Sequence, residues 1–130
     1  RIIVALVLIA HGIGHSMGVL GAWTTIPSGL TNRSWLFSSG VLVDSATGRV
    51  WSLLWLAALV VTTAGGLGLL LQQDWWRTVA VAGAILSLVA IVPWLAAMPL
   101  GSAIGAVAID ILVLAILLLP VGEQFVRQLR

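Results

Sequence analysis

The 130-residue sequence contains no cysteine, no lysine and no tyrosine. Without cysteine, the chain cannot form disulfides, thiolate metal sites or iron–sulfur clusters. Without lysine it has no Schiff-base chemistry, and without tyrosine it has no phenolic acid for proton or radical transfer. Charged residues make up only 8% of the chain, against about 25% in ordinary soluble domains. The six positive charges are all arginines scattered along the chain, so we expect no nucleic-acid partner.

Hydrophobic residues make up 61% of the chain, and the mean hydropathy is +1.17. A soluble domain of this length cannot hide so many apolar side chains from water, so a lipid bilayer is the expected solvent. A membrane-crossing helix needs about 20 apolar residues. Four segments satisfy this requirement, at about 2–22, 50–71, 76–97 and 100–119. The sequence therefore predicts an all-α protein, a bundle of four transmembrane helices that forms a single integral membrane domain over 1–130.

Several features refine this layout. Pro93 is expected to kink the third span or to loosen its last turn. The N-terminal stretch has a single leading Arg1 and two histidines, so we expect a retained span rather than a signal peptide. The loop of about 27 residues, 23–49, has two turn-rich segments around the apolar stretches 34–37 and 41–43. We expect it to lie over the mouth of the bundle or in the headgroup layer, as a short interfacial helix or hairpin.

Arginine positions predict the orientation of the spans. One side of the membrane would hold Arg1, Arg77, Arg127 and Arg130, whereas the other would hold Arg33 and Arg49. Positive charge near span ends favours the cytoplasmic side, so both termini are expected there and the loop 23–49 outside. The expected location is a bacterial inner membrane, with the chain crossing it several times.

Tryptophans near the span ends predict an aromatic belt, because indole rings prefer the headgroup level. The residues of this predicted belt are Trp23, Trp51, Trp75, Trp76 and Trp94.

Asp110 is the one acidic residue near the middle of a predicted span. An ionised carboxylate there costs about 2.5–3.5 kcal/mol on insertion scales, so the group is expected to be protonated, paired or facing a cavity. Ser102 and Ala106 precede Asp110 at intervals of four residues and place small side chains on the same helix face. This face is therefore expected to point into the bundle.

His11 and His15 are four residues apart and share one face of the first span. His11 and Asp110 both lie nine residues from the same end of their spans, about 13–14 Å from that boundary. The first and fourth spans are antiparallel, so a contact between His11 and Asp110 is geometrically available. In such a pair the carboxylate orients the imidazole, which in turn supports the charge on the carboxylate.

Small residues recur every four positions on the first and third spans. The residues are Ala10, Gly14, Gly18 and Ala22 on the first, with Gly83 and Ser87 on the third. Such patterns allow helices to approach closely. The favoured interpretation is packing within one chain, and the alternative is a homo-oligomer or larger membrane complex formed through Gly14, Gly18 and Gly83. The hydroxyls of Ser87 and of Thr62 or Thr63 are expected to hydrogen-bond to their own helices.

The segment His11-Gly12-Ile13-Gly14-His15-Ser16-Met17-Gly18 resembles the HGxxHxxG first helix of small bacterial four-span membrane proteins. Further similarities are Leu54-Trp55-Leu56-Ala57-Ala58 in the second span and Asp74-Trp75-Trp76 before the third. Members of this set are uncharacterised, so the resemblance implies the four-helix architecture and no reaction. The likeness to DoxX-like proteins is one of architecture alone.

These features favour a protein that binds or transports a small or lipophilic ligand, with proton linkage through an intramembrane His/Asp centre. The candidate ligand-binding or proton-linked residues are His11, His15, Asp110 and Ser87. The alternative is an accessory or assembly subunit of a larger membrane complex, with a purely structural polar centre. Minor alternatives are a haem or pigment ligated by His11 or His15, or a metal held by both histidines and Asp110. No nucleophile spacing or phosphate loop is visible, so an enzyme is not the favoured interpretation.

Overall fold

The computed structural model describes residues 1–31, 33–36 and 41–129, and the secondary structure of this part of the chain is helical, without strands. Four segments are long and apolar enough to cross a membrane, Ile2–Trp23, Ala46–Leu70, Trp76–Ala97 and Leu100–Leu118. The predicted all-α fold with four helices long enough to span a membrane is therefore confirmed. This architecture is that of a multi-pass membrane protein.

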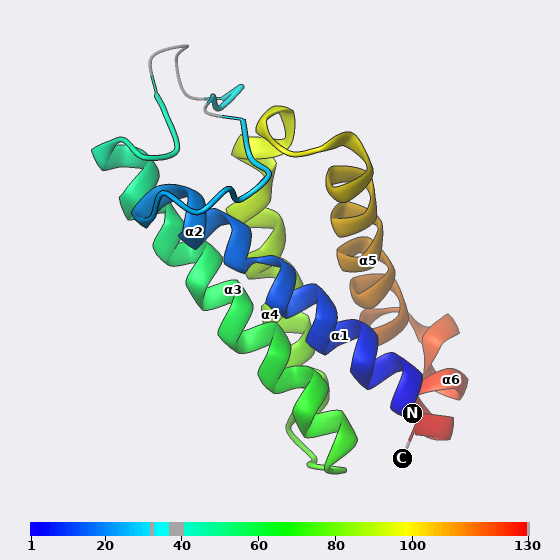
Figure 1. Ribbon diagram of the computed structural model, residues 1–130. Helices are drawn as coiled ribbons and strands as arrows, with labels where there is room; N and C mark the ends of the chain where they lie inside the picture. Colours follow the sequence, from blue (N-terminus) through cyan, green and yellow to red (C-terminus); the bar gives the residue numbers. More distant parts are fainter. Residues whose placement is uncertain (32, 37–40, 130) are drawn as a thin grey trace.

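The first and third spans each contain two helical elements. The elements in chain order are α1 (Ile2–Gly14), α2 (Ser16–Trp23), α3 (Ala46–Leu70), α4 (Trp76–Ile91), η1 (Val92–Ala97), α5 (Leu100–Leu118), η2 (Pro120–Gly122) and α6 (Glu123–Leu129). Figure 1 shows Arg1 and α6 at one end of the bundle and the 24–45 connection at the other.

Helix α3 packs along α1, α2 and α4, whereas α5 packs mainly on α4. Within the most apolar window of each span, 44% of the third span is buried but only 17% of the fourth. Helix α5 is thus peripheral, and it stands apart from α1, which packs on α3 (Figure 1). This arrangement leaves room between α1 and α5.

The second span begins at Ala46 rather than near residue 50. Ser45 is its N-cap, because the Ser45 Oγ accepts a hydrogen bond from the Gly48 backbone N–H at 3.2 Å. The connection between the first two spans is therefore residues 24–45, shorter than expected. Helix α6 lies beyond the four predicted spans. Arg77 ties it to the bundle by donating to the Leu117 carbonyl and to Glu123.

Pro93 has the expected effect on the third span, since residues Val92–Ala97 form a 3₁₀ helix. Backbone carbonyls at this end accept hydrogen bonds from the 24–45 connection. The Thr31 N–H donates to Ala97 at 2.7 Å, and both the Ser34 hydroxyl and the Trp35 N–H donate to Pro93. The described residues of the connection thus lie against this end of the third span. Those of its apolar stretches form no helix or strand, and the Ser34 N–H donates to the Val41 carbonyl at 3.4 Å. Residues 32 and 37–40 lie outside the described residues, so the expected course of the loop stays a prediction.

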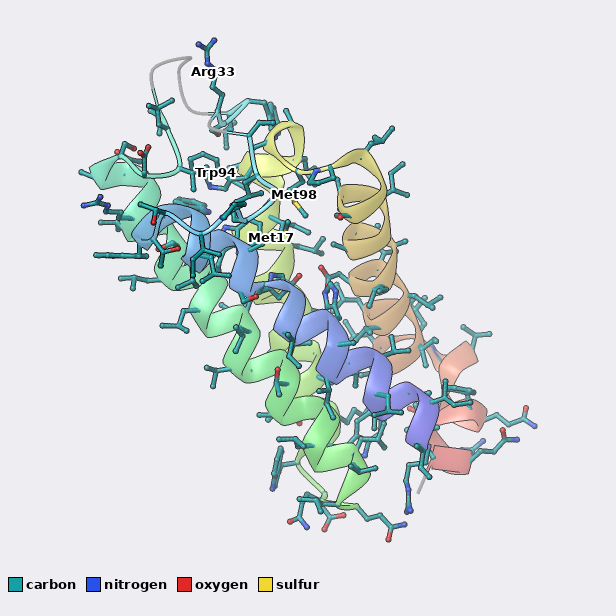
Figure 2. The ribbon with its side chains drawn as sticks, viewed as in Figure 1. Met17, Arg33, Trp94 and Met98 are labelled. Carbon is teal, nitrogen blue, oxygen red and sulfur yellow. The ribbon has the colours of Figure 1, made fainter. Side chains whose placement is uncertain are left out.

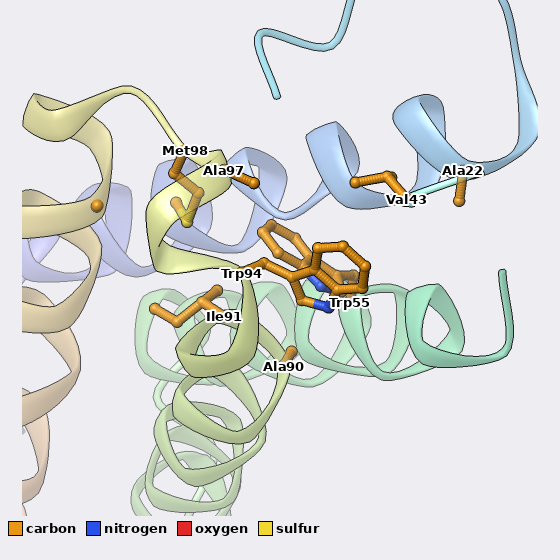
Figure 3. Packing of buried hydrophobic residues seen from close by; sticks show 9 residues of the cluster. Ala22, Val43, Trp55, Ala90, Ile91, Trp94, Ala97 and Met98 are labelled. Carbon is orange, nitrogen blue, oxygen red and sulfur yellow. The ribbon is translucent and has the colours of Figure 1, made fainter. Parts of the chain in front are cut away.

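A hydrophobic cluster fills the bundle near the 24–45 connection, with Trp55 and Trp94 at its centre (Figure 3). Trp94 is only 2% exposed and Trp76 only 4%, so the prediction that they belong to an aromatic belt is wrong. The 3₁₀ helix carries Trp94 inward against the second span, and Trp76 packs with α6 residues in a second cluster. Trp23 and Trp75 are exposed, consistent with a belt.

Two glycines of the first span have different surroundings. A Cβ added at Gly18 would collide with the Trp55 ring, whereas one added at Gly14 would meet no atom within 4 Å. The space beside Gly83 is also filled by a residue of the same chain, since a Cβ added at Gly83 would lie 2.7 Å from the Thr62 Oγ1. Gly18 and Gly83 therefore allow helix packing inside the chain, as the favoured interpretation requires. Association through the three predicted glycines stays a prediction.

Gly18→Ala is expected to lower the free energy of unfolding by about 1–3 kcal/mol, because overpacking displaces the Trp55 ring. Gly14→Ala is the matched control, and its effect should be neutral or stabilising, by up to about 1 kcal/mol. Reversible unfolding in mixed detergent micelles measures both variants. Equal destabilisation by the two substitutions would contradict the packing described.

Candidate functional site

Asp110 lies on α5 with no exposed surface, and both of its carboxylate oxygens are hydrogen-bonded. The His11 Nε2 donates to one oxygen at 2.8 Å, and the Ser87 hydroxyl donates to the other. The predicted contact between His11 and Asp110 is therefore confirmed. An ionised carboxylate can only accept hydrogen bonds, so to an ionised Asp110 His11 donates from a protonated Nε2.

Ser87 lies on α4, and its hydroxyl bonds across the bundle rather than to its own helix. The Ser87 Oγ is also 3.3 Å from the His11 Nε2, so it can accept part of that N–H while donating its own proton to Asp110. The expectation of a bond within the helix is wrong, because the close crossing of α4 and α5 offers a carboxylate instead. We refer to His11, Ser87 and Asp110 as the polar centre, which joins α1, α4 and α5.

Thr62 and Thr63 also depart from expectation. Their hydroxyl oxygens have no hydrogen-bond partner among the described residues, so neither bonds to its own helix there. The Thr62 hydroxyl lies against Gly83 and the Thr63 hydroxyl against Gly12, where the absence of a side chain lets the helices approach. Both threonines therefore contribute to packing beside the polar centre.

His15 lies at the junction of α1 and α2, where the helix locally tightens. Its N–H bonds to the Gly12 carbonyl, and its own carbonyl accepts from the Gly18 N–H, both across three residues. Tight turns of this kind within a helix often mark functional positions. The His15 side chain does not join the polar centre, although its ring centroid lies 5.0 Å from that of His11.

The His15 ring lies between two other rings. It makes edge contacts with His11 and with Trp55, whose ring centroid is 5.7 Å away. His15 is only 2% exposed, and its Nε2 has no hydrogen-bond partner among the described residues. Sequence reasoning identified His15 as a candidate but not this state, because the ring's surroundings depend on how α3 crosses α1.

A cavity of about 500 Å³ lies between the first span and α5. Both histidines line it. The other lining residues are Val7, Ala10, Gly14, Met17, Trp55, Ile91, Met98, Ser102, Ala106 and Ile109. Met17 and Met98 lie near its end toward the 24–45 connection (Figure 2). The lining includes no arginine, aspartate or glutamate, and Asp110 lies behind His11 rather than in the wall.

A second, apolar pocket of about 210 Å³ continues toward the end of the bundle that holds Arg1 and α6. It shares Val7 and Ile109 with the cavity. Its other lining residues are Ile3, Val4, Leu8, Trp76, Leu112, Val113, Ile116, Leu117, Phe125 and Leu129. Both spaces lie between α1 and α5. The lining of the cavity includes the two histidines, whereas the lining of the second pocket is apolar and aromatic.

The residues proposed for a metal site are only partly brought together. His11 contacts Asp110, but its Nε2 is already committed to that carboxylate, and the His15 Nε2 has no hydrogen-bond partner among the described residues. Among the described residues, no group of three histidine, aspartate or glutamate side chains could hold a metal ion. The arrangement found is suited to hydrogen bonding in an apolar enclosure.

Comparisons of the chain with family models, with curated proteins and with solved structures find no match. The function is therefore inferred from the geometry of the site.

A double-mutant cycle tests the polar centre. Replacing His11 and Asp110 by alanine, singly and together, should give an interaction energy of about 1–3 kcal/mol, the range for contacting partners. The matched cycle with His15 and Asp110 should give less than about 0.5 kcal/mol, because no hydrogen bond joins them. Unfolding in mixed micelles measures both cycles, and equal values would show that the 2.8 Å contact has no special energetic role.

Proposed function

We propose that the protein binds a small, membrane-soluble molecule in the cavity between the first span and α5, to hold it or to carry it across the membrane. The single observation that carries this proposal is the cavity itself, about 500 Å³ in volume and lined by both histidines at the level of the polar centre. Ligand sites are typically apolar enclosures of about 300–1,000 Å³ with a few placed polar groups.

The route into the cavity would lead from the bilayer. Helix α5 is the least buried span and is separated from α1 along the cavity, so a lipophilic molecule can approach between these two helices. A molecule dissolved in the hydrocarbon layer would then exchange one apolar environment for another. Hydrogen bonds to the histidines would supply the additional affinity, since lipid offers few such partners.

The polar centre would orient the wall of the cavity. Asp110 and Ser87 together fix the ring of His11, and this ring forms part of the lining. We propose that ligand binding is coupled to the proton that the hydrogen-bonded His11–Asp110 pair shares. His15 is the other titratable group in this part of the bundle. We retain a bacterial inner membrane, with cytoplasmic termini, as the proposed setting.

Gly14→Leu tests the site, because Gly14 lines the cavity and a Cβ added there would meet no atom within 4 Å. We expect the affinity of the variant for the molecule that co-purifies with the protein to fall about tenfold or more, equivalent to about 1.4 kcal/mol of binding free energy. Native mass spectrometry of protein released from membranes measures the bound fraction.

Gly105→Leu is the matched control, because its Cβ also meets no atom within 4 Å and Gly105 does not line the cavity. It should retain the bound molecule. Equal retention by both variants would refute the site, and a haem or chlorophyll absorbance band in the purified protein would replace this proposal with a pigment site.

Asp110→Asn tests the coupling of the polar centre to binding. The amide has nearly the shape of the carboxylate but lacks its charge, so His11 loses a charge-assisted hydrogen bond. We expect affinity for the co-purified molecule to fall about tenfold, as for about 1.4 kcal/mol, and proton uptake or release on binding to disappear. Calorimetry in buffers of different ionisation enthalpy measures both effects. Unchanged affinity together with an unchanged proton count would rule out this role.

A second candidate function, an accessory subunit of a larger complex, is favoured by one observation. Gly101 and Gly105 are four residues apart on α5, and added Cβ atoms at both would meet no atom within 4 Å. Unlike Gly18 and Gly83, this pair is free to receive a neighbouring helix. In that case Gly105→Leu would dissociate an oligomer or complex seen by light scattering in mild detergent, while Gly14→Leu would leave it intact.

A further inference from the structure

We infer that the bound molecule is a neutral single-chain amphiphile, whose hydroxyl or carbonyl head hydrogen-bonds to His15 while its apolar tail extends into the apolar pocket beside α1, α5 and α6. This inference deepens the proposed function and rests on it. It assigns the ligand's chemical class, its direction in the membrane and the residue that contacts its head.

The first observation is the unsatisfied His15 side chain. The residue is 2% exposed, lines the cavity, and has a buried Nε2 without a hydrogen-bond partner among the described residues. Buried polar atoms are almost always paired, so the unpaired Nε2 of a residue that lines the cavity favours a partner supplied from outside the chain. The Nε2 itself has almost no surface open to the cavity, so a ligand head would reach it through a turn of the His15 ring. A hydroxyl suits either tautomer of the ring because it can both donate and accept.

The two histidines differ in their availability for this bond. The His11 Nε2 is already committed to Asp110 and lies close to Ser87. His15 has only ring contacts, with His11 and Trp55, on the sides where it meets the chain. His11 is therefore a positioning residue that fixes one side of the His15 ring, and His15 is the residue that would touch the ligand.

The second observation is the absence of charge in the lining. The residues around the cavity include no arginine, aspartate or glutamate, and the chain contains no lysine. The nearby Asp110 carboxylate is fully buried and bonded at both oxygens. The wall thus holds no permanently charged side chain to compensate a buried phosphate, carboxylate or ammonium head, which favours a neutral head.

The third observation is the direction of the adjoining apolar pocket. It shares Val7 and Ile109 with the cavity and continues toward Ile3 and Ile116, with only apolar and aromatic side chains around it. A head placed at His15 therefore has an adjoining apolar space for its tail, toward the end of the bundle where the chain begins. Met17 and Met98 line the other end of the cavity, and their flexible thioethers can adapt to different heads.

Photolabelling in phosphatidylcholine nanodiscs tests the inference. The probes are hexadecanol, hexadecyl phosphate and hexadecyltrimethylammonium, each carrying a diazirine either beside the head or at the far end of the chain. Peptide mass spectrometry then locates the labelled residues. We expect hexadecanol to label cavity and pocket residues at least about tenfold more than either charged probe, as for about 1.4 kcal/mol of discrimination.

The two diazirine positions report direction. Hexadecanol with the diazirine beside its head should label Met17 or Met98, and with the diazirine at the far end it should label Ile3 or Ile116. His15→Phe keeps a ring but removes the nitrogen, and should reduce labelling about three- to tenfold, the effect of one hydrogen bond. Ile13→Phe, at an exposed position on the same span, is the matched control and should leave labelling unchanged.

The outcomes separate this inference from the proposed function. If no probe labels cavity residues above exposed Leu53, the proposed function fails as well. If cavity labelling is specific but equal for charged and neutral probes, reversed in direction, or unchanged in His15→Phe, the inference is overturned and the proposed function stands. The charge and direction comparisons use the unmodified chain, so they remain decisive even if His15→Phe does not fold.

Discussion

The buried carboxylate of Asp110 is the constraint on which the rest of the structure depends. A carboxylate at membrane depth is costly unless donors surround it, and here the donors come from two other helices, His11 on α1 and Ser87 on α4. Three of the four spans must therefore meet at one level of the bundle. Because removing any one partner leaves a buried polar group unpaired, the network specifies how these helices are placed relative to one another.

This meeting point also accounts for the space beside it. Helix α5 packs on α4 and reaches α1 through the hydrogen bond of Asp110 rather than through close backbone packing. Small residues on the facing surfaces, Gly14 on α1 and Ala106 on α5, leave the volume around that bond unfilled. The same interaction that joins the helices thus keeps a cavity open next to His15, whose Nε2 has no hydrogen-bond partner in the part of the chain that the structure describes.

Much of the fold could be predicted from hydropathy, because the length and apolarity of each span are local properties. The level of His11 and Asp110 followed from counting residues along two antiparallel helices, so their contact could be predicted as well. The roles of Ser87 and Trp94 could not be predicted in this way. Each depends on a crossing between helices or on the inward turn of the 3₁₀ helix after Ile91, and periodicity along one segment carries no information about its neighbour.

Some helix boundaries could be predicted from the sequence and others could not. Pro93 marks its 3₁₀ segment directly in the sequence, whereas the early start of α3 depends on the Ser45 cap, within a stretch that was expected to be loop. The state of His15 was beyond sequence reasoning for a different reason. A residue type and a helix face identify a candidate, but the lack of a hydrogen-bond partner appears only when every neighbouring side chain is in place.

The central claim is that the space between α1 and α5 holds a ligand beside the histidines. The most direct measurement is an experimental structure of the protein in nanodiscs formed from its own membrane, at a resolution that shows side chains. We expect ordered, elongated density between these helices, with its polar end within hydrogen-bonding distance of His15 and its tail toward Ile116. Direct packing of α1 against α5, with the cavity closed, would contradict it.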